Sequence, residues 1–371
     1  MSQNIEPVLI TQPDLPEFEK LIPYLKDIWD RKWLTNNGAF HQELEIKLAE
    51  YLNVPYVSLF SNGTLALITA IQCFDLSGEV ITTPYSFVAT THSLWWNNIK
   101  PVFVDIENVY GNIDTSKIEA AITPNTTAIL AVHVYGNPCN TIEIERIAKK
   151  YNLKVIYDAA HAFGVEYNGV NVLNSGDLSI LSFHATKVFN TFEGGAIISH
   201  SIENKKRIDL LKNFGIQDED TIVSVGINAK MNEFQSAIGL LQLQEHDERI
   251  SKRKKVFEYY FDKLNFIDGI RLVHSDKNTL SNYAYLPILV DSEIYPINRD
   301  ELFIKLKNQE IIARKYFYPL ISNIETYKSL ESSAKDNLKV ANNFSNQVIC
   351  LPIFPDLEFS VIDRIINIIK S

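Results

Sequence analysis

Short apolar runs recur along the first half of the chain, and several of them are separated by stretches with helical periodicity. The runs are rich in Val, Ile, Leu and Phe and are bounded by Gly, Pro or polar residues, which is typical of buried strands. Strands separated by helices form βαβ units, so the pattern predicts an α/β fold with a mostly parallel sheet covered by helices. The predicted strands are 56–60, 79–84, 101–106, 127–133, 154–160, 178–183 and, after a polar loop, 196–198.

Apolar residues at helical spacing predict helices before, within and after this region. The pattern changes after Ser199, where a helix is followed by a polar loop over 215–230 and a long helical run over 231–264. Short strands and a few helices follow from residue 268 onward. We therefore expect a large domain over 1–250 and a smaller C-terminal α+β domain over 251–371. The predicted helices are 17–33, 42–52, 65–74, 89–97, 115–121, 141–151, 205–214, 231–264, 298–309 and 359–370.

Composition and charge exclude several classes of partner. The 371 residues carry a formal net charge of −10, which argues against a nucleic-acid-binding surface and against a polybasic membrane anchor. No apolar run approaches the roughly 20 residues of a membrane span, and the N-terminus lacks the basic start and apolar run of a signal peptide. Cys73, Cys139 and Cys350 are far apart and form no disulfide framework or metal motif. We expect a cytoplasmic protein without a metal site.

Polar residues follow the apolar runs at the strand ends, where parallel sheets bind their ligands. Ser61–Thr64 opens a helix, whose N-terminus can bind a phosphate through free N–H groups, although these residues also form a good N-cap. Asp158 ends a strand, where a buried carboxylate needs a cation or N–H groups as partners. A helix N-cap role suits Asp158 equally well, and His161 suits a polar pocket wall as well as a catalytic role.

Lys187 follows the next strand, one βαβ step beyond Asp158. Taken alone it is a surface lysine at a loop tip. With Asp158 and the helix N-terminus at Gly63 and Thr64, however, it completes the set that pyridoxal 5′-phosphate (PLP) requires. The lysine forms a Schiff base, the aspartate keeps the pyridine nitrogen protonated, the helix holds the phosphate, and Phe87 is placed to stack on the ring. Lys187 then acts as a general base, which requires a lowered pKa.

Motifs of other cofactors and catalytic machineries are absent from the sequence. There is no G-x-G-x-x-G after the first strand, no G-x-x-x-x-G-K-[ST], no H-E-x-x-H and no G-x-S-x-G.

At these residues the chain resembles the fold-type I nucleotide-sugar aminotransferases of the DegT/StrS type, and the resemblance covers nearly the whole chain. It implies the fold-type I architecture of a large sheet domain with a smaller C-terminal domain. The motifs that carry it, in order, are WLTNNG, SNGTLAL, TTPYSFVAT, PVFVDI, AAITPNTTAILAVHVYGNP, YDAAHAFG, SFHATK with EGGA, GINAKMNEFQSAIGLLQL and YFYPL.

The resemblance also implies a role for each matching residue. Lys187 would be the Schiff-base lysine, Asp158 would pair with the pyridine nitrogen, and His161 would lie near the phenolic oxygen, where many members have Gln. The family works as homodimers with shared active sites. The implied phosphate contacts are Gly63, Thr64, Ser182 and, from the neighbouring subunit, Asn228.

The implied reaction is amino transfer from L-glutamate, which becomes 2-oxoglutarate, to a nucleotide-linked keto-deoxysugar. Lysine at 187, where dehydratase relatives carry histidine, favours amino transfer over dehydration, and KVFNTFEGGA resembles the C-4 rather than the C-3 group. We therefore expect amination at C-4 of dTDP-4-keto-6-deoxy-D-glucose for O-antigen or other cell-surface glycan synthesis. A C-3 aminotransferase, a PLP-dependent sugar dehydratase and a non-enzymatic regulator are the alternatives. The expected substrate contacts are Thr35, Asn36, His184, Arg314 and Tyr316.

Overall fold

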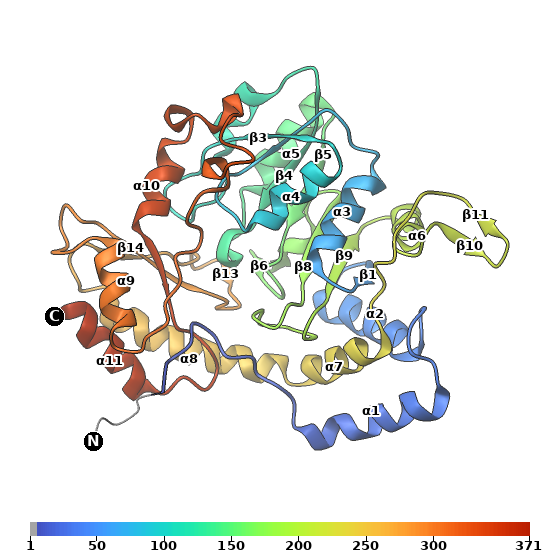
Figure 1. The fold of residues 1–371 in the computed structure, drawn as a ribbon, viewed down its shortest axis with the longest axis horizontal. Coiled ribbons are helices and arrows are strands. Elements are labelled where there is room, and N and C mark those ends of the chain that lie inside the picture. The colour runs from blue at the N-terminus through green and yellow to red at the C-terminus, as the bar shows by residue number, and fades with distance from the viewer. Residues whose placement is uncertain (1–5) are drawn as a thin grey trace.

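The computed structural model describes residues 6–371, and its centre is a seven-stranded sheet covered by helices (Figure 1). The strands lie in the order β1-β9-β8-β5-β4-β2-β3. β9 runs antiparallel to both of its neighbours, and the other pairings are parallel. The predicted α/β fold with a mostly parallel sheet is confirmed. The strands are β1 (Tyr56–Phe60), β2 (Glu79–Thr82), β3 (Lys100–Phe103), β4 (Thr126–Val132), β5 (Lys154–Asp158), β8 (Leu178–Ser182) and β9 (Gly195–Ser199).

Neighbouring residues of a strand point to opposite faces of the sheet. Both faces of this sheet carry apolar side chains, and helices cover both. Ile180 of β8 and Ile197 of β9 pack in one cluster with α3 and α6, whereas Leu181 and Ala196 pack in another with α2 and α7. The helices do not cover the carboxyl ends of the parallel strands, where a cavity opens. The helices of this part are α1 (Phe18–Arg31), α2 (Ala39–Leu52), α3 (Gly63–Cys73), α4 (Val88–Trp96), α5 (Thr141–Tyr151), α6 (Ile202–Leu211) and α7 (Glu233–Gln244).

The C-terminal part has its own apolar core around an antiparallel sheet in the order β12-β14-β15. The N-terminal segment joins it, since Val8 pairs with Ile311. The predicted boundary at 250/251 falls inside α8 and stays a prediction. The elements of this part are α8 (His246–Leu264), β12 (Ile270–Leu272), β14 (Leu286–Val290), α9 (Arg299–Lys307), α10 (Lys339–Gln347), β15 (Val348–Leu351) and α11 (Phe359–Lys370).

Smaller elements connect the two parts. A three-stranded sheet pairs β13 (Thr279–Leu280) with β6 (Glu166–Tyr167), which also pairs with β7 (Val170–Asn171).

Within the described residues 6–371, no helix combines the length and the apolar character needed to cross a bilayer. The 3₁₀ turns are Thr115–Lys117, Glu119–Ala121, Val134–Gly136, Val172–Asn174, Ile321–Asn323, Glu331–Ser333 and Lys335–Asn337.

Several elements differ from the sequence predictions. The run over 231–264 is two helices, α7 and α8, separated at Glu245, whose backbone leaves the helical region. The predicted loop over 215–230 contains a hairpin of β10 (Ile216–Asp218) and β11 (Thr221–Ile222), whose strands carry no buried side chain and therefore show no buried-exposed alternation. The predicted helix over 115–121 is two 3₁₀ turns. The helix α10 was not predicted, because Asn and Ser are weak helix formers.

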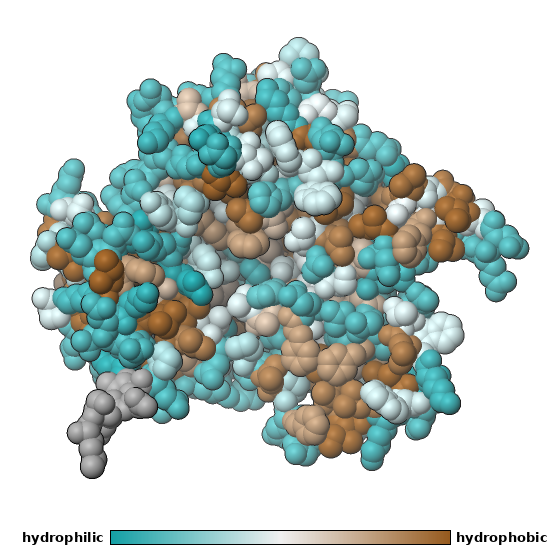
Figure 2. All heavy atoms as spheres, viewed as in Figure 1, coloured by the Kyte–Doolittle hydropathy of each residue, from teal (hydrophilic) through white to brown (hydrophobic). Residues whose placement is uncertain are grey.

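Apolar side chains are exposed along α1 and around the hairpin (Figure 2). Phe18 and Trp29 of α1 are 64% and 71% exposed, and Val225, just after the hairpin, is 95% exposed. Exposed apolar patches of this kind are typical of interaction sites.

Candidate active site

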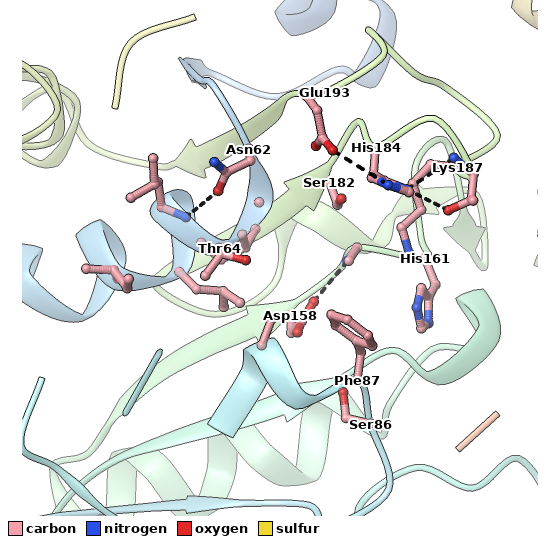
Figure 3. Close-up of a pocket in the computed structure, with 18 of the residues that line it drawn as sticks. Asn62, Thr64, Ser86, Phe87, Asp158, His161, Ser182, His184, Lys187 and Glu193 are labelled. Atoms are coloured by element: carbon pink, nitrogen blue, oxygen red, sulfur yellow. Dashed lines mark hydrogen bonds and ion pairs between the residues drawn. The ribbon is translucent and has the colours of Figure 1, made fainter. Parts of the chain in front are cut away.

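A cavity of about 830 Å³ lies at the open edge of the large sheet, where β1, β2, β5 and β8 end (Figure 3). Its lining contains most of the residues that the sequence predicted for the site, so segments more than 100 residues apart in the sequence meet there. The predicted residues in the lining are Gly63, Thr64, Phe87, Asp158, His161, Ser182, His184, Lys187 and Tyr316.

The turn from β1 into α3 forms one wall of this cavity. The Asn62 side chain accepts a hydrogen bond from the Leu65 N–H over 2.9 Å, which leaves the N–H groups of Gly63 and Thr64 as those an anion would meet at the helix N-terminus. A Cβ atom at Gly63 would lie 3.0 Å from the Ser182 Cβ. The close approach of these two segments favours glycine there, and it places the Ser182 hydroxyl beside the helix N-terminus.

Asp158 ends β5 and is the last member of a chain of hydrogen bonds. The chain runs from Ser86, just before α4, through Thr90 of α4 to the carboxylate. Thr90 Oγ1 donates to Asp158 Oδ2 over 2.6 Å, Ser86 Oγ lies 2.7 Å from Thr90 Oγ1, and the Ala160 N–H donates to Asp158 Oδ1 over 3.1 Å. Burial raises the pKa of Asp158, while Thr90, the Ala160 N–H and the positive charge of Lys187 oppose this shift. The carboxylate is therefore fixed in position but lacks a full ionic partner, which a cationic ligand atom can supply.

Lys187 lies on the loop between β8 and β9, with its side chain directed toward Asp158 and His161 (Figure 3). Its Nζ donates a hydrogen bond to the Tyr285 hydroxyl over 3.3 Å. Burial lowers the pKa of Lys187 to about 8, and the charges of Asp158 and Tyr316 oppose this shift. A lysine with this pKa is partly neutral near pH 7 and can act as a nucleophile or general base.

His161 is buried beside the carboxylate. Its ring stacks on Phe317 with centroids 5.7 Å apart, and its Nδ1 accepts a hydrogen bond from the Tyr135 N–H over 3.2 Å. Burial holds the pKa of His161 well below its usual value, with Lys187 adding to the shift. The neutral ring therefore carries its proton on Nε2, which makes that nitrogen a donor.

The mouth of the cavity carries two polar side chains, His184 and Glu193, and two exposed aromatic side chains, Phe87 and Trp96. His184 is exposed, its Nε2 lies 3.6 Å from Glu193 Oε1, and its Nδ1 accepts a hydrogen bond from the Thr186 N–H over 3.3 Å. Glu193 belongs to the EGGA stretch and lines the cavity, although sequence reasoning did not identify it as a site residue. His184 and Glu193 can both bind hydroxyl groups of a polar substrate.

Four predicted residues lie outside the lining of this cavity, and their roles stay predictions. Thr35 and Asn36 are exposed in the loop between α1 and α2. Arg314 is exposed, and its backbone pairs with Cys350. Asn228 is exposed near the hairpin, where its Oδ1 accepts a hydrogen bond from Lys230 over 2.9 Å.

Sequence reasoning missed three residues besides Glu193. Ser86 and Thr90 lie within TTPYSFVAT, four positions apart. Side chains at this spacing are neighbours at a helix start, so the sequence could have indicated that the two hydroxyl groups meet. Tyr285 directly precedes β14. No local sequence pattern marks it as a site residue, because only the packing of the C-terminal part brings it to Lys187.

The chain is similar to known proteins over almost its whole length. The sequence profile of the DegT/DnrJ/EryC1/StrS aminotransferase family matches residues 17–370. The chain is 53% identical to dTDP-4-amino-4,6-dideoxy-D-glucose transaminase of Shigella dysenteriae over 366 residues, 99% of each chain. It is 32% identical to GDP-perosamine synthase of Escherichia coli O157:H7 over 94% of this chain and 93% of the relative.

Solved structures show the same similarity. DesI, crystallised with its TDP-sugar product, superposes with a TM-score of 0.93 at 31% identity, covering 98% of this chain and 92% of DesI. Helicobacter pylori PseC, an aminotransferase of pseudoaminic acid biosynthesis, superposes with a TM-score of 0.91 at 28% identity and covers 98% of both chains.

Proposed function

This chain belongs to the DegT/DnrJ/EryC1/StrS aminotransferase family, and on that premise we propose that it aminates C-4 of dTDP-4-keto-6-deoxy-D-glucose. The amino donor is L-glutamate, and the product is dTDP-4-amino-4,6-dideoxy-D-glucose, a precursor for O-antigen or another cell-surface glycan. The observation that carries the proposal is the match, over almost the whole of both chains, to a transaminase named for this sugar nucleotide.

The cavity residues fit PLP. The helix N-terminus at Gly63 and Thr64, with the Ser182 hydroxyl beside it, suits a phosphate, and the Asp158 carboxylate suits a protonated ring nitrogen. Phe87 is 58% exposed and lines the cavity, which suits a stacked aromatic ring. When bound there, PLP supplies the aldehyde that carries the amino group and a ring that accepts electrons.

Each residue then has a defined task. Lys187 is the proton carrier, since its lowered pKa lets Nζ take up and return a proton near neutral pH. Asp158 orients the ring through its nitrogen, and Thr90 prevents the carboxylate from rotating. The Nε2–H group of His161 is the donor that suits a negatively charged phenolic oxygen.

The substrate would enter through the mouth of the cavity. His184 and Glu193 would bind hydroxyl groups of the keto sugar, and Tyr316 adds a lining residue from the C-terminal part of the chain. The nucleotide would extend outward from there, and the exposed side chains of Arg314, Thr35 and Asn36 would meet it.

We also propose a cytoplasmic homodimer with shared sites. The exposed apolar residues of α1 and of the hairpin region offer a surface for a second copy. Asn228 follows the hairpin, is exposed and lies outside its own cavity, which is consistent with a role at the phosphate of the other subunit. The buried thiols Cys73, Cys139 and Cys350 fit a reducing compartment.

The test is incubation of the purified protein with PLP, L-glutamate and dTDP-4-keto-6-deoxy-D-glucose, with assignment of the product by NMR. We expect an amine at C-4 and stoichiometric 2-oxoglutarate, and we expect Lys187→Ala to form neither. An amine at C-3 would refute the proposed position. A wild-type protein that stays colourless with added PLP would refute the aminotransferase itself.

A further inference from the structure

Tyr285 enters the cavity from the C-terminal part of the chain, 98 residues beyond Lys187. It comes directly before β14, whose first residue, Leu286, pairs with Leu351 of β15. The Tyr285 oxygen accepts a hydrogen bond from Lys187 Nζ over 3.3 Å, and its ring centroid lies 5.9 Å from that nitrogen. Within residues 6–371 this is the only side-chain hydrogen bond of Lys187, so the lysine amine lies where the two parts of the chain meet.

Three rings fix the position of Tyr285. Its centroid lies 4.8 Å from that of His161, 5.5 Å from that of Tyr135 and 5.9 Å from that of Tyr316. The contacts with His161 and Tyr316 are edge-to-face, the arrangement that aromatic pairs prefer. A ring supported on three sides has one position for its hydroxyl group, so the C-terminal part of the chain helps to set the position of the Lys187 amine.

The charged form of Lys187 benefits from an oxygen acceptor. An amine that takes up and returns a proton passes through an ammonium, which makes stronger hydrogen bonds than the neutral amine. Asp158 favours that ammonium electrostatically, but its carboxylate already accepts hydrogen bonds from Thr90 and the Ala160 N–H. Tyr285 is the group within hydrogen-bonding distance of Nζ.

We propose that Tyr285 is a further catalytic residue, whose phenol oxygen holds the Lys187 amine in position and stabilises the ammonium that forms when Lys187 takes a proton. The proton stays on Nζ, and no covalent bond to Tyr285 forms or breaks. This inference rests on the proposed function, in which Lys187 carries the proton.

The test compares Tyr285→Phe, which keeps the ring and removes the oxygen, with Tyr283→Phe on the same segment. Tyr283 lies outside the lining of the active-site cavity, so its variant controls for the loss of a phenol oxygen nearby. The first measurement is labelling of Lys187 by an amine-reactive reagent in the full chain freed of cofactor, across a range of pH, with peptide mass spectrometry. The second is kcat and KM of the PLP-loaded enzyme.

For Tyr285→Phe we expect the labelling profile to move to lower pH by about half a unit to one unit, because the ammonium loses its acceptor. We expect kcat to fall about tenfold or more with KM changed less than about threefold, and Tyr283→Phe to match the wild type. Thermal unfolding verifies that both variants fold.

An unchanged labelling profile in Tyr285→Phe would overturn the proposal, even with a lower kcat, because packing alone would then explain the loss. A wild-type protein without transaminase activity would refute the proposed function. The labelling profile would still decide whether Tyr285 controls the Lys187 amine.

Discussion

Thr90 Oγ1 lies 2.6 Å from Asp158 Oδ2, and this hydrogen bond ties the first turns of α4 to the end of β5. Both side chains are buried, and Thr90 in turn lies 2.7 Å from the Ser86 hydroxyl. Since Thr90 donates to the carboxylate, Ser86 donates to Thr90. The orientation of Asp158 therefore depends on a neighbouring helix as well as on its own strand.

Thr90→Val keeps the shape of the side chain and removes this donor. We expect kcat to fall about tenfold and the affinity for PLP to weaken, because a hydrogen bond to a charged group contributes about 1.5–3 kcal/mol. Steady-state kinetics and titration of the cofactor-free protein with PLP measure both effects. Ser93→Ala is the control, since Ser93 is buried on the same helix and its hydroxyl donates to the Thr90 carbonyl oxygen rather than to Asp158. Equal losses in both variants would contradict the role of Thr90.

His184→Ala should raise the KM for the sugar nucleotide about tenfold and leave the half-reaction with L-glutamate nearly unchanged. The side chain lies at the cavity mouth beside Glu193, away from Asp158, so we expect it to contact the larger substrate. Single-turnover measurements of each half-reaction separate the two effects. Glu193→Gln, which removes the charge but keeps the shape, should show a smaller change in the same direction. A loss of equal size in both half-reactions would instead assign His184 to the shared chemistry.

A purified mixed dimer of Lys187→Ala and Asn228→Asp subunits tests the shared site. If Asn228 serves the partner's phosphate, one of the two sites in the mixed dimer has both native residues. We then expect about half of the wild-type activity, although each homodimer is nearly inactive. The subunits carry different affinity tags for purification, and activity is measured with L-glutamate and the keto sugar. Activity no higher than the mean of the two parent homodimers would show that Asn228 acts within its own subunit.

Acid should destabilise the protein through His41, a buried residue of α2. Burial lowers its pKa to about 4, with Lys212 adding to the shift and Glu45 opposing it. Between pH 6.5 and about 4 the unfolded chain binds this proton and the folded chain does not. The free energy of unfolding therefore falls as the pH drops through this window, by about 3 kcal/mol in total.

His41→Leu should remove this part of the pH dependence. Urea unfolding of the variant and the wild type at several pH values between 4.5 and 7 measures it. A slope that stays the same in His41→Leu would assign the acid sensitivity to other groups.

Local pattern was sufficient to predict the mostly parallel central sheet and the residues that line one cavity at its edge. Apolar runs ending at Ser182 and Asp158 marked two neighbouring strands, and the carboxyl ends of parallel strands meet at one edge. Lys187, Asp158 and Gly63 could therefore be assigned to one site from their positions along the chain. The motifs around them were sufficient to predict the family.

Other features depend on contacts between distant segments. Glu233 lies in the first turn of α7 and has no exposed surface, because its carboxylate accepts hydrogen bonds from the Phe40 and His41 N–H groups at the start of α2. Nothing in the helical pattern around it marks a buried carboxylate. The hairpin at 216–222 was missed for a related reason, since it has no buried face and hence no periodic signal.

The sequence by itself determined the sheet, the strand-end lysine and aspartate and the helix N-terminus at Gly63, because each depends on periodicity or on position along a strand. Only the tertiary structure decided what surrounds these groups. Thr90 reaches Asp158 because α4 packs beside β5, and Tyr285 reaches Lys187 because the C-terminal part of the chain closes over the sheet edge. Burial in the assembled cavity lowers the pKa of Lys187 to about 8.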